Sequence, residues 1–281
     1  MEKKLDNSRA EKLRKWYELE KQIKERMKNI KFKIAVMSGK GGVGKSFVTA
    51  NLAIALSLRG FKVGVLDADI HGPSIPRLLG VHTKGLTADE KGIKPAISNH
   101  GIKIISIDFL LPSGESPVVW RGPLKTAAIR QFLGQVDWGE LDFLLIDLPP
   151  GTGDEPLTIA QSIPDMTAVI MVTIPSELSQ DVVKKAITFA RAVKVPLLGI
   201  IENMSYFTCP KCGERHYIFG KGGGESLSKA TGVTMLGSIP LDPEASEMAD
   251  KGLSFLTEMK ESEIAKEFNK IVDKVLEKIK A

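Results

Sequence analysis

Short apolar runs alternate with longer amphipathic stretches along most of this chain. The apolar runs predict buried strands over 34–37, 61–66, 102–107, 141–146, 168–172, 197–201 and 233–239. Helical patterns lie between them over 47–58, 123–133 and 178–193, and two more helical segments follow 239. This alternation predicts an α/β fold whose mostly parallel, twisted sheet has helices on both faces and binds ligands at its carboxyl edge.

Amphipathic segments also occupy both ends of the chain. We predict a charged amphipathic helix over 1–31, a main domain over 32–260 and a C-terminal helix over 261–281 packed on that domain. The first segment has these apolar residues at helical spacing: Leu13, Trp16, Leu19, Ile23, Met27 and Ile30. It either packs on the domain or a partner subunit, or presents a basic face to a membrane or an acidic client.

An apolar stripe in the last segment also fits a helix on a membrane surface. The stripe consists of Ile264, Phe268, Ile271, Val275 and Ile279. Residues 261–281 contain five acidic and five basic side chains, so they lack the cationic face that anionic lipids attract. We therefore expect this helix to dock on the domain.

Composition narrows the class of protein. The 281 residues are 43% hydrophobic and 26% charged, as in a globular protein with a sizeable core. The net charge of +5 comes from residues 1–31, where 11 Lys and Arg accompany 6 Asp and Glu, so the main domain offers no basic face to nucleic acid. No apolar stretch reaches about 18 residues and no signal-peptide pattern is present, so we expect a cytoplasmic protein without stable membrane association.

A glycine-rich stretch over 38–46 joins the first predicted strand to the first predicted helix. Gly39, Gly44, Lys45 and Ser46 fit the phosphate-loop pattern G-x-x-x-x-G-K-S/T. Glycines let successive backbone N–H groups surround an anion at a helix N-terminus. We expect Lys45 to contact the β- and γ-phosphates of ATP and Ser46 to ligate Mg²⁺. The residues between complete the binding loop: Lys40, Gly41, Gly42 and Val43.

Aspartates follow two other predicted strands. Asp147 ends the run 141–146, where a carboxylate holds the water shell of Mg²⁺ in nucleotide hydrolases. Asp67 and Asp69 follow the run 61–66, and we assign Asp69 to positioning or activating the hydrolytic water. The alternative is that each carboxylate only caps backbone N–H groups at a strand end.

The chain contains two cysteines, Cys209 and Cys212, in a C-x-x-C turn, too few for a disulfide framework. Converging sulfurs suit a tetrahedral metal, a [4Fe–4S] cluster or a redox disulfide. One chain cannot supply four thiolates, whereas a two-fold dimer can. His216 lies four residues further on and leaves a Zn²⁺ site open, and an inert pair is a further alternative.

Together, four segments resemble one family. They are 39–46 with its extra Lys40, 67–74, 147–154 and 209–212. This combination resembles the Mrp/ApbC group of deviant-Walker-A ATPases, which are iron–sulfur cluster carriers and scaffolds related more distantly to MinD, ParA and the nitrogenase iron protein. The resemblance spans roughly residues 32–260.

The resemblance implies a role for several further residues. Lys40 would reach across a homodimer interface to the nucleotide of the other subunit, although binding phosphate within its own chain or remaining solvated is the alternative. Asn203 would contact adenine, and backbone near Pro240 and Leu241 would close the base pocket. Cys209 and Cys212 from two subunits would hold a bridging [4Fe–4S] cluster.

The resulting hypothesis is an ATP-dependent iron–sulfur cluster carrier. It predicts a homodimer that binds Mg-ATP, hydrolyses it slowly and passes its cluster to apo-proteins. The main alternative is a MinD- or ParA-like positioning ATPase acting on membrane or DNA, and a third is an electron-donating reductase like the nitrogenase iron protein. We expect residues 112–122 to form an exposed loop without a catalytic role.

Overall fold

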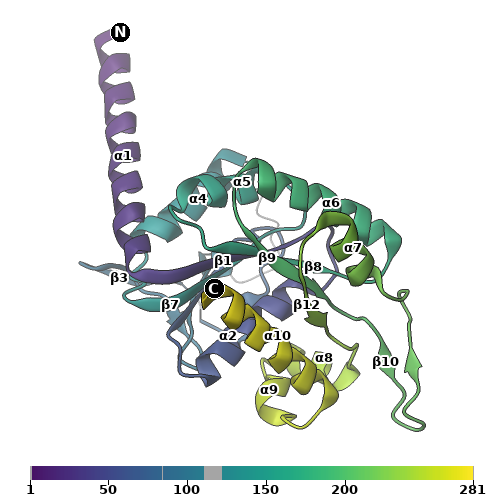
Figure 1. The fold of residues 1–281 in the computed structure, drawn as a ribbon. Helices are drawn as coiled ribbons and strands as arrows, with labels where there is room; N and C mark the ends of the chain where they lie inside the picture. The colour runs from purple at the N-terminus through teal and green to yellow at the C-terminus, as the bar shows by residue number, and fades with distance from the viewer. Residues whose placement is uncertain (1, 84, 111–121, 281) are drawn as a thin grey trace.

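One large sheet organises the chain in the computed structural model, which describes residues 2–83, 85–110 and 122–280, with side chains from Glu11 onward except Lys12 (Figure 1). Within these residues, eight strands pair in the order β12-β9-β8-β1-β7-β2-β6-β5. Their bounds are β1 Ile30–Ser38, β2 Val63–Asp67, β5 Ala96–Ile97, β6 Lys103–Ser106, β7 Leu141–Asp147, β8 Ala168–Thr173, β9 Leu197–Glu202 and β12 Met235–Ser238. Neighbours are parallel except β5 with β6. The predicted fold class is confirmed.

Helices cover both faces of this sheet, as Figure 1 shows. One face packs against α2 Lys45–Leu58, α3 Ile75–Leu78, α8 Pro243–Asp250, α9 Phe255–Glu258 and α10 Glu263–Lys280. The other packs against α4 Gly122–Gln135, α5 Asp154–Ser162, α6 Glu177–Ala192, α7 Gly223–Thr231 and the end of α1 Glu2–Lys28. Because successive strand residues point to opposite faces, Ile34 and Val36 join the first layer while Ala35 and Met37 join the second.

Among the described side chains, the N-terminal helix contacts α4 from Trp16 onward, where the Arg130 guanidinium lies over the Trp16 ring and pairs with Glu20. Ile23 and Met27 are buried beside α4, whereas Leu13 and Trp16 are 58% and 49% exposed. Figure 1 shows the first part of α1 extending beyond the body of the molecule. The prediction that Ile30 belongs to this helix is wrong, because α1 ends at Lys28 and Ile30 begins β1, where it pairs with Leu141 of β7.

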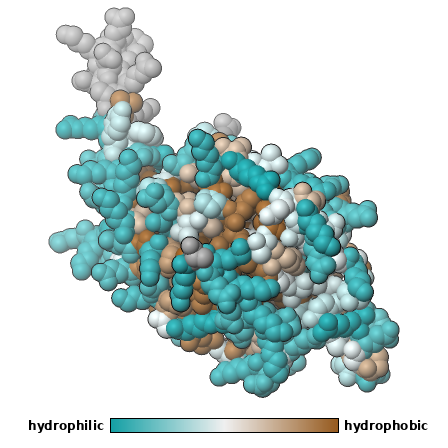
Figure 2. Space-filling model, viewed as in Figure 1, coloured by the Kyte–Doolittle hydropathy of each residue, from teal (hydrophilic) through white to brown (hydrophobic). Residues whose placement is uncertain are grey.

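Four of the five residues in the apolar stripe of α10 are buried in the core, and Ile279 is partly buried. Ile264, Phe268, Ile271 and Val275 are each at most 2% exposed, and Phe268 meets Phe255 edge-to-face. No described helix is long and apolar enough to cross a membrane. Hydrophilic side chains cover most of the face shown in Figure 2, with hydrophobic residues visible between them.

Two hairpins and one loop complete the description. β3 Ala88–Asp89 pairs with β4 Gly92–Ile93, and β10 Phe207–Thr208 pairs with β11 Arg215–His216 in the hairpin that carries the cysteines. The loop predicted over 112–122 lies outside the described residues except for Gly122, which begins α4.

Candidate nucleotide site and cysteine hairpin

The phosphate loop connects the carboxyl end of β1 to the N-terminus of α2. Gly44 directly precedes α2 with φ +78°, a left-handed conformation that favours glycine. A Cβ at Gly39 would lie 2.7 Å from the backbone of Val182 and Val183. Backbone conformation thus favours glycine at 44, and the close approach of α6 favours it at 39.

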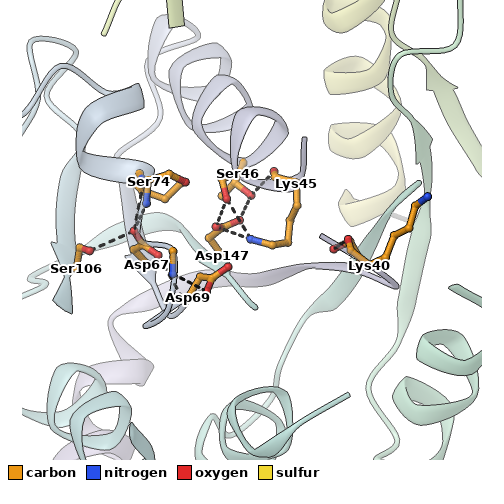
Figure 3. Close-up of polar contacts among 12 residues, drawn as sticks. Lys40, Lys45, Ser46, Asp67, Asp69, Ser74, Ser106 and Asp147 are labelled. Carbon is orange, nitrogen blue, oxygen red and sulfur yellow. Dashed lines mark hydrogen bonds and ion pairs between the residues drawn. The ribbon is translucent and has the colours of Figure 1, made fainter. Parts of the chain in front are cut away.

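Three hydroxyl or amine groups of α2 converge on Asp147, which is fully buried (Figure 3). The Lys45 amine and the Ser46 hydroxyl each donate to Asp147 Oδ2 at 2.6 Å. The Thr49 hydroxyl donates to Oδ1 at 2.7 Å. The Lys45 amine also donates to the Ser46 hydroxyl at 3.1 Å, so it holds these two side chains together at the start of α2. Thr49 was not predicted, although its position four residues after Lys45 places it on the same helix face.

Asp67 lies beside Asp147 at the same sheet edge, where the two are register partners of β2 and β7. Its Oδ2 accepts hydrogen bonds from the Ser74 and Ile75 amides at 3.1 and 3.2 Å, and from the Ser106 hydroxyl at 3.1 Å. Burial, followed by repulsion from Asp147, raises the pKa of Asp67 to about 8 despite these donors. Asp67 therefore carries a proton at neutral pH in this arrangement.

Asp69 and Lys40 lie outside this buried cluster. Asp69 is half-buried, and its Oδ1 accepts a hydrogen bond from the Gly72 amide at 3.2 Å. The Lys40 side chain points away from Lys45 and Asp147 (Figure 3). Asp69 is thus at the edge predicted for it, and Lys40 is directed away from the phosphate-binding centre of its own chain.

The residues predicted to contact adenine line one pocket beside the loop. Asn203, Pro240 and Leu241 share a pocket of about 240 Å³ with Gly44 and Phe47. The Asn203 amide donates to the Val43 carbonyl at 3.0 Å, which ties the pocket to the phosphate loop. Phe47 was not predicted as a lining residue, because its apolar character also suits the core, where it stacks on Phe255 at 5.6 Å.

The cysteines lie in the turn of the β10–β11 hairpin. The Cys209 amide donates to the Glu214 carbonyl at 2.9 Å, and the Gly213 amide donates to the Cys209 carbonyl at 2.8 Å. Hydrogen bonds from the backbone amides of Cys212 and Lys211 hold the pKa of the Cys209 thiol below its usual range. This favours the thiolate, the form that binds metals.

His216 does not join the cysteines as a third ligand. It lies at the foot of the hairpin, where it pairs with Phe207. Across the described part of the chain, no three His, Cys, Asp or Glu side chains converge as metal ligands. Within the described residues, Cys209 and Cys212 therefore form a pair of sulfurs without a third ligand from the same chain.

A phosphate loop at the carboxyl edge of a parallel sheet, with Asp147 at the end of the neighbouring strand, defines this protein as a P-loop NTPase. Residues 29–276 match the ParA family model described as NUBPL iron-transfer P-loop NTPase, and the chain belongs to this family. This matched range extends further at both ends than the range 32–260 over which the sequence resembles the family.

Individual relatives agree with this assignment. An iron–sulfur cluster carrier protein of Saccharolobus solfataricus is 56% identical over 254 residues, which cover 90% of this chain and 86% of the relative. The solved structure of a nucleotide-binding protein from Archaeoglobus fulgidus in complex with ADP has a TM-score of 0.74 and 48% identity, covering 83% of this chain and 91% of that one. MinD of Pyrococcus horikoshii complexed with Mg-ADP has a TM-score of 0.65 and 26% identity, covering 89% and 99%.

Proposed function

We propose that this protein holds a [4Fe–4S] cluster between two copies of the chain, binds Mg-ATP, and passes the cluster to apo-proteins. The observation that carries the proposal is the exposed turn with Cys209 and Cys212, which offers two thiolates where a cluster needs four. A two-fold axis beside this turn supplies the other pair from the second copy. The names of the close relatives support iron–sulfur clusters as the cargo.

The nucleotide site supports a slow hydrolysis that depends on the dimer. In the proposed active state, the Lys45 amine moves from Asp147 to the phosphates, and Ser46 together with Asp147 holds Mg²⁺ and its waters. Asp69 orients the attacking water. Lys40, which points away from its own centre, neutralises charge developing on the nucleotide of the partner subunit.

Anaerobic reconstitution with ferrous iron and sulfide tests the cluster assignment. Absorption spectroscopy and native mass measurement should show a wild-type dimer with one [4Fe–4S] cluster, and Cys209→Ala should form none. The variant should still bind ATP, because its nucleotide residues are unchanged. A Cys209→Ala protein that holds the same cluster would contradict the bridging site, and a wild type that forms no cluster under these conditions would contradict the cargo.

The positioning-ATPase alternative gains no support from the C-terminal stripe. That stripe is the feature that fits a membrane-surface helix, and its members Ile264, Phe268, Ile271 and Val275 are buried against the sheet. Core packing accounts for these four, and the fifth member, Ile279, is partly buried against the same cluster. The cluster carrier is therefore the function that we propose.

A further inference from the structure

In the described part of the chain, the contacts that hold the cysteine hairpin to the domain lie at its base. Its ladder consists of two residue pairs, Phe207 with His216 and Thr208 with Arg215. Every residue from 210 to 220 is exposed, and Figure 1 shows the hairpin extending from the body of the molecule. An isolated two-stranded hairpin is marginally stable in water. Contacts at the base therefore determine where the two cysteines lie.

Glu263, in the first turn of α10, accepts three hydrogen bonds at this base. The Thr208 hydroxyl donates to Oε2 at 2.8 Å, and the Tyr206 hydroxyl and the Arg215 guanidinium donate to Oε1 at 3.1 and 2.5 Å. The Arg215 guanidinium also lies 4.3 Å from the centre of the Tyr206 ring. One carboxylate on a core-packed helix thus fixes both strands of the hairpin, including the residue before Cys209.

The protonation states of this cluster favour these hydrogen bonds. Partial burial alone would raise the pKa of Glu263, but the hydrogen bonds from Thr208, Tyr206 and Arg215 outweigh it and hold that pKa below its usual range. Burial raises the pKa of the Tyr206 hydroxyl, which stays a donor. Glu263 is therefore an ionised acceptor at neutral pH.

The base of the hairpin also adjoins the wall of the predicted adenine pocket. The Leu241 amide donates to the Tyr206 carbonyl at 2.7 Å. A second pocket, lined by Phe207, Pro210 and Glu263 among others, shares residues 240–242 with the adenine pocket. Segment 240–242 is consequently a common wall, with the nucleotide side on one face and the cysteine hairpin on the other.

We propose that Glu263 is a positioning residue that couples the two sites: it holds the hairpin against segment 240–242, so that filling the adenine pocket restricts access to Cys209 and Cys212. The inference rests on the proposed function only in assigning the adenine pocket and in giving the cysteines their cargo. It concerns the position of the hairpin, which is measurable without any cluster.

Thiol reactivity measures this position directly, because Cys209 and Cys212 are the two cysteines of the chain. The reduced, metal-free full-length protein is treated with an aromatic disulfide reagent, with and without Mg-ADP. We expect Mg-ADP to slow the wild-type reaction at least threefold. Without nucleotide, Glu263→Gln and Arg215→Gln should each raise the reaction rate by about three- to tenfold, because the hairpin moves more freely once the charged hydrogen bond at its base is lost. Each variant should also abolish the effect of Mg-ADP.

Glu261→Gln is the matched control. Glu261 lies two residues before Glu263, is 92% exposed and pairs with Lys266, away from the hairpin. This variant should react like wild type under both conditions. Arg215 is half exposed, so Arg215→Gln removes the same ion pair without disturbing the core, and equal melting temperatures confirm that each variant is folded. In the double variant the two effects should not add, because both remove one interaction.

Each outcome separates this inference from the carrier proposal. A wild-type rate that bound Mg-ADP leaves unchanged would overturn the coupling, whereas a protein that does not bind Mg-ADP would overturn the assigned adenine pocket and the coupling with it. A Glu263→Gln protein that reacts like wild type would overturn the role of Glu263. If the thiol rates behave as expected but reconstitution yields no cluster, the carrier proposal fails and the positioning role stands.

Discussion

Replacing Asp67 with asparagine should change how the stability of this protein depends on pH. Asp67 is 1% exposed and is the register partner of Asp147 on the neighbouring strand. Burial and this repulsion raise the pKa of Asp67 to about 8 from an ordinary value of 3.8. Between these values the folded chain keeps a proton that the unfolded chain has lost. The contribution of Asp67 to stability therefore falls as pH rises toward 8 and is constant above it.

The size of the effect follows from the width of this window. Each pH unit within it lowers the unfolding free energy by about 1.4 kcal/mol relative to a side chain that does not titrate. Asp67→Asn cannot ionise, and its amide oxygen can still accept from Ser74 and Ile75 in the place of Oδ2. Between pH 5 and pH 7, the wild type should lose about 3 kcal/mol of stability relative to the variant.

Urea unfolding at pH 5, 6, 7 and 8, without nucleotide or Mg²⁺, measures this difference. Asp89→Asn is the control: hydrogen bonds from Lys94 hold the pKa of Asp89 below its usual range, so its carboxylate is ionised in the folded and unfolded chains across the window. The difference between wild type and Asp89→Asn should not change with pH. A difference between wild type and Asp67→Asn that is equally flat would refute the reasoning, because it would mean that Asp67 is ionised throughout.

Three further substitutions test other parts of the site. Lys40→Ala should bind ATP like wild type but hydrolyse it about 10³-fold more slowly, as expected for a cation supplied in trans; unchanged turnover would contradict a role across the interface. Thr49→Val should lower the free energy of urea unfolding by about 1–3 kcal/mol, because buried Asp147 loses a donor at 2.7 Å; Thr188→Val, on the exposed side of α6, should not. Asn203→Ala should weaken ATP and ADP binding about tenfold in a fluorescence titration, and equal affinities would place the base elsewhere.

The features that the sequence predicted depend on short-range patterns. The phosphate loop is defined by local spacing between Gly39 and Ser46, and Asp147 follows an apolar run that has few alternatives to a buried strand. Parallel strands bring their carboxyl ends to one edge of the sheet. The sequence therefore places Asp67 and Asp147 at the same edge without any information on side-chain contacts, and the two are register partners. The parallel sheet is predicted in the same way, from short apolar runs that alternate with amphipathic helical stretches.

The features that the sequence did not predict depend on contacts between distant segments. Glu263 meets Arg215 across 48 positions, and no local pattern distinguishes it from the other acidic residues of its helix. The prediction that Ile30 is helical was wrong because an apolar residue near the end of a helix also suits the first position of a strand. Its pairing with Leu141 decides for the strand. Likewise, helical spacing cannot tell that Trp16 is half exposed while Ile23 is buried.

The nucleotide pocket and the cysteine hairpin share a connection that makes them hard to vary independently. Asn203, the predicted adenine contact, directly follows β9. Three residues, Met204 to Tyr206, separate it from Phe207, the first residue of the hairpin. The Ser205 amide donates to the Ile239 carbonyl and the Leu241 amide to the Tyr206 carbonyl, so this connection is bonded along its length to the segment after β12. Met204 between them adopts φ +53°, a conformation that the surrounding contacts must impose. A displacement of Asn203 should therefore also displace Tyr206. Moving the hairpin into a relative would require residues 203–206 and the segment after β12 to be moved with it.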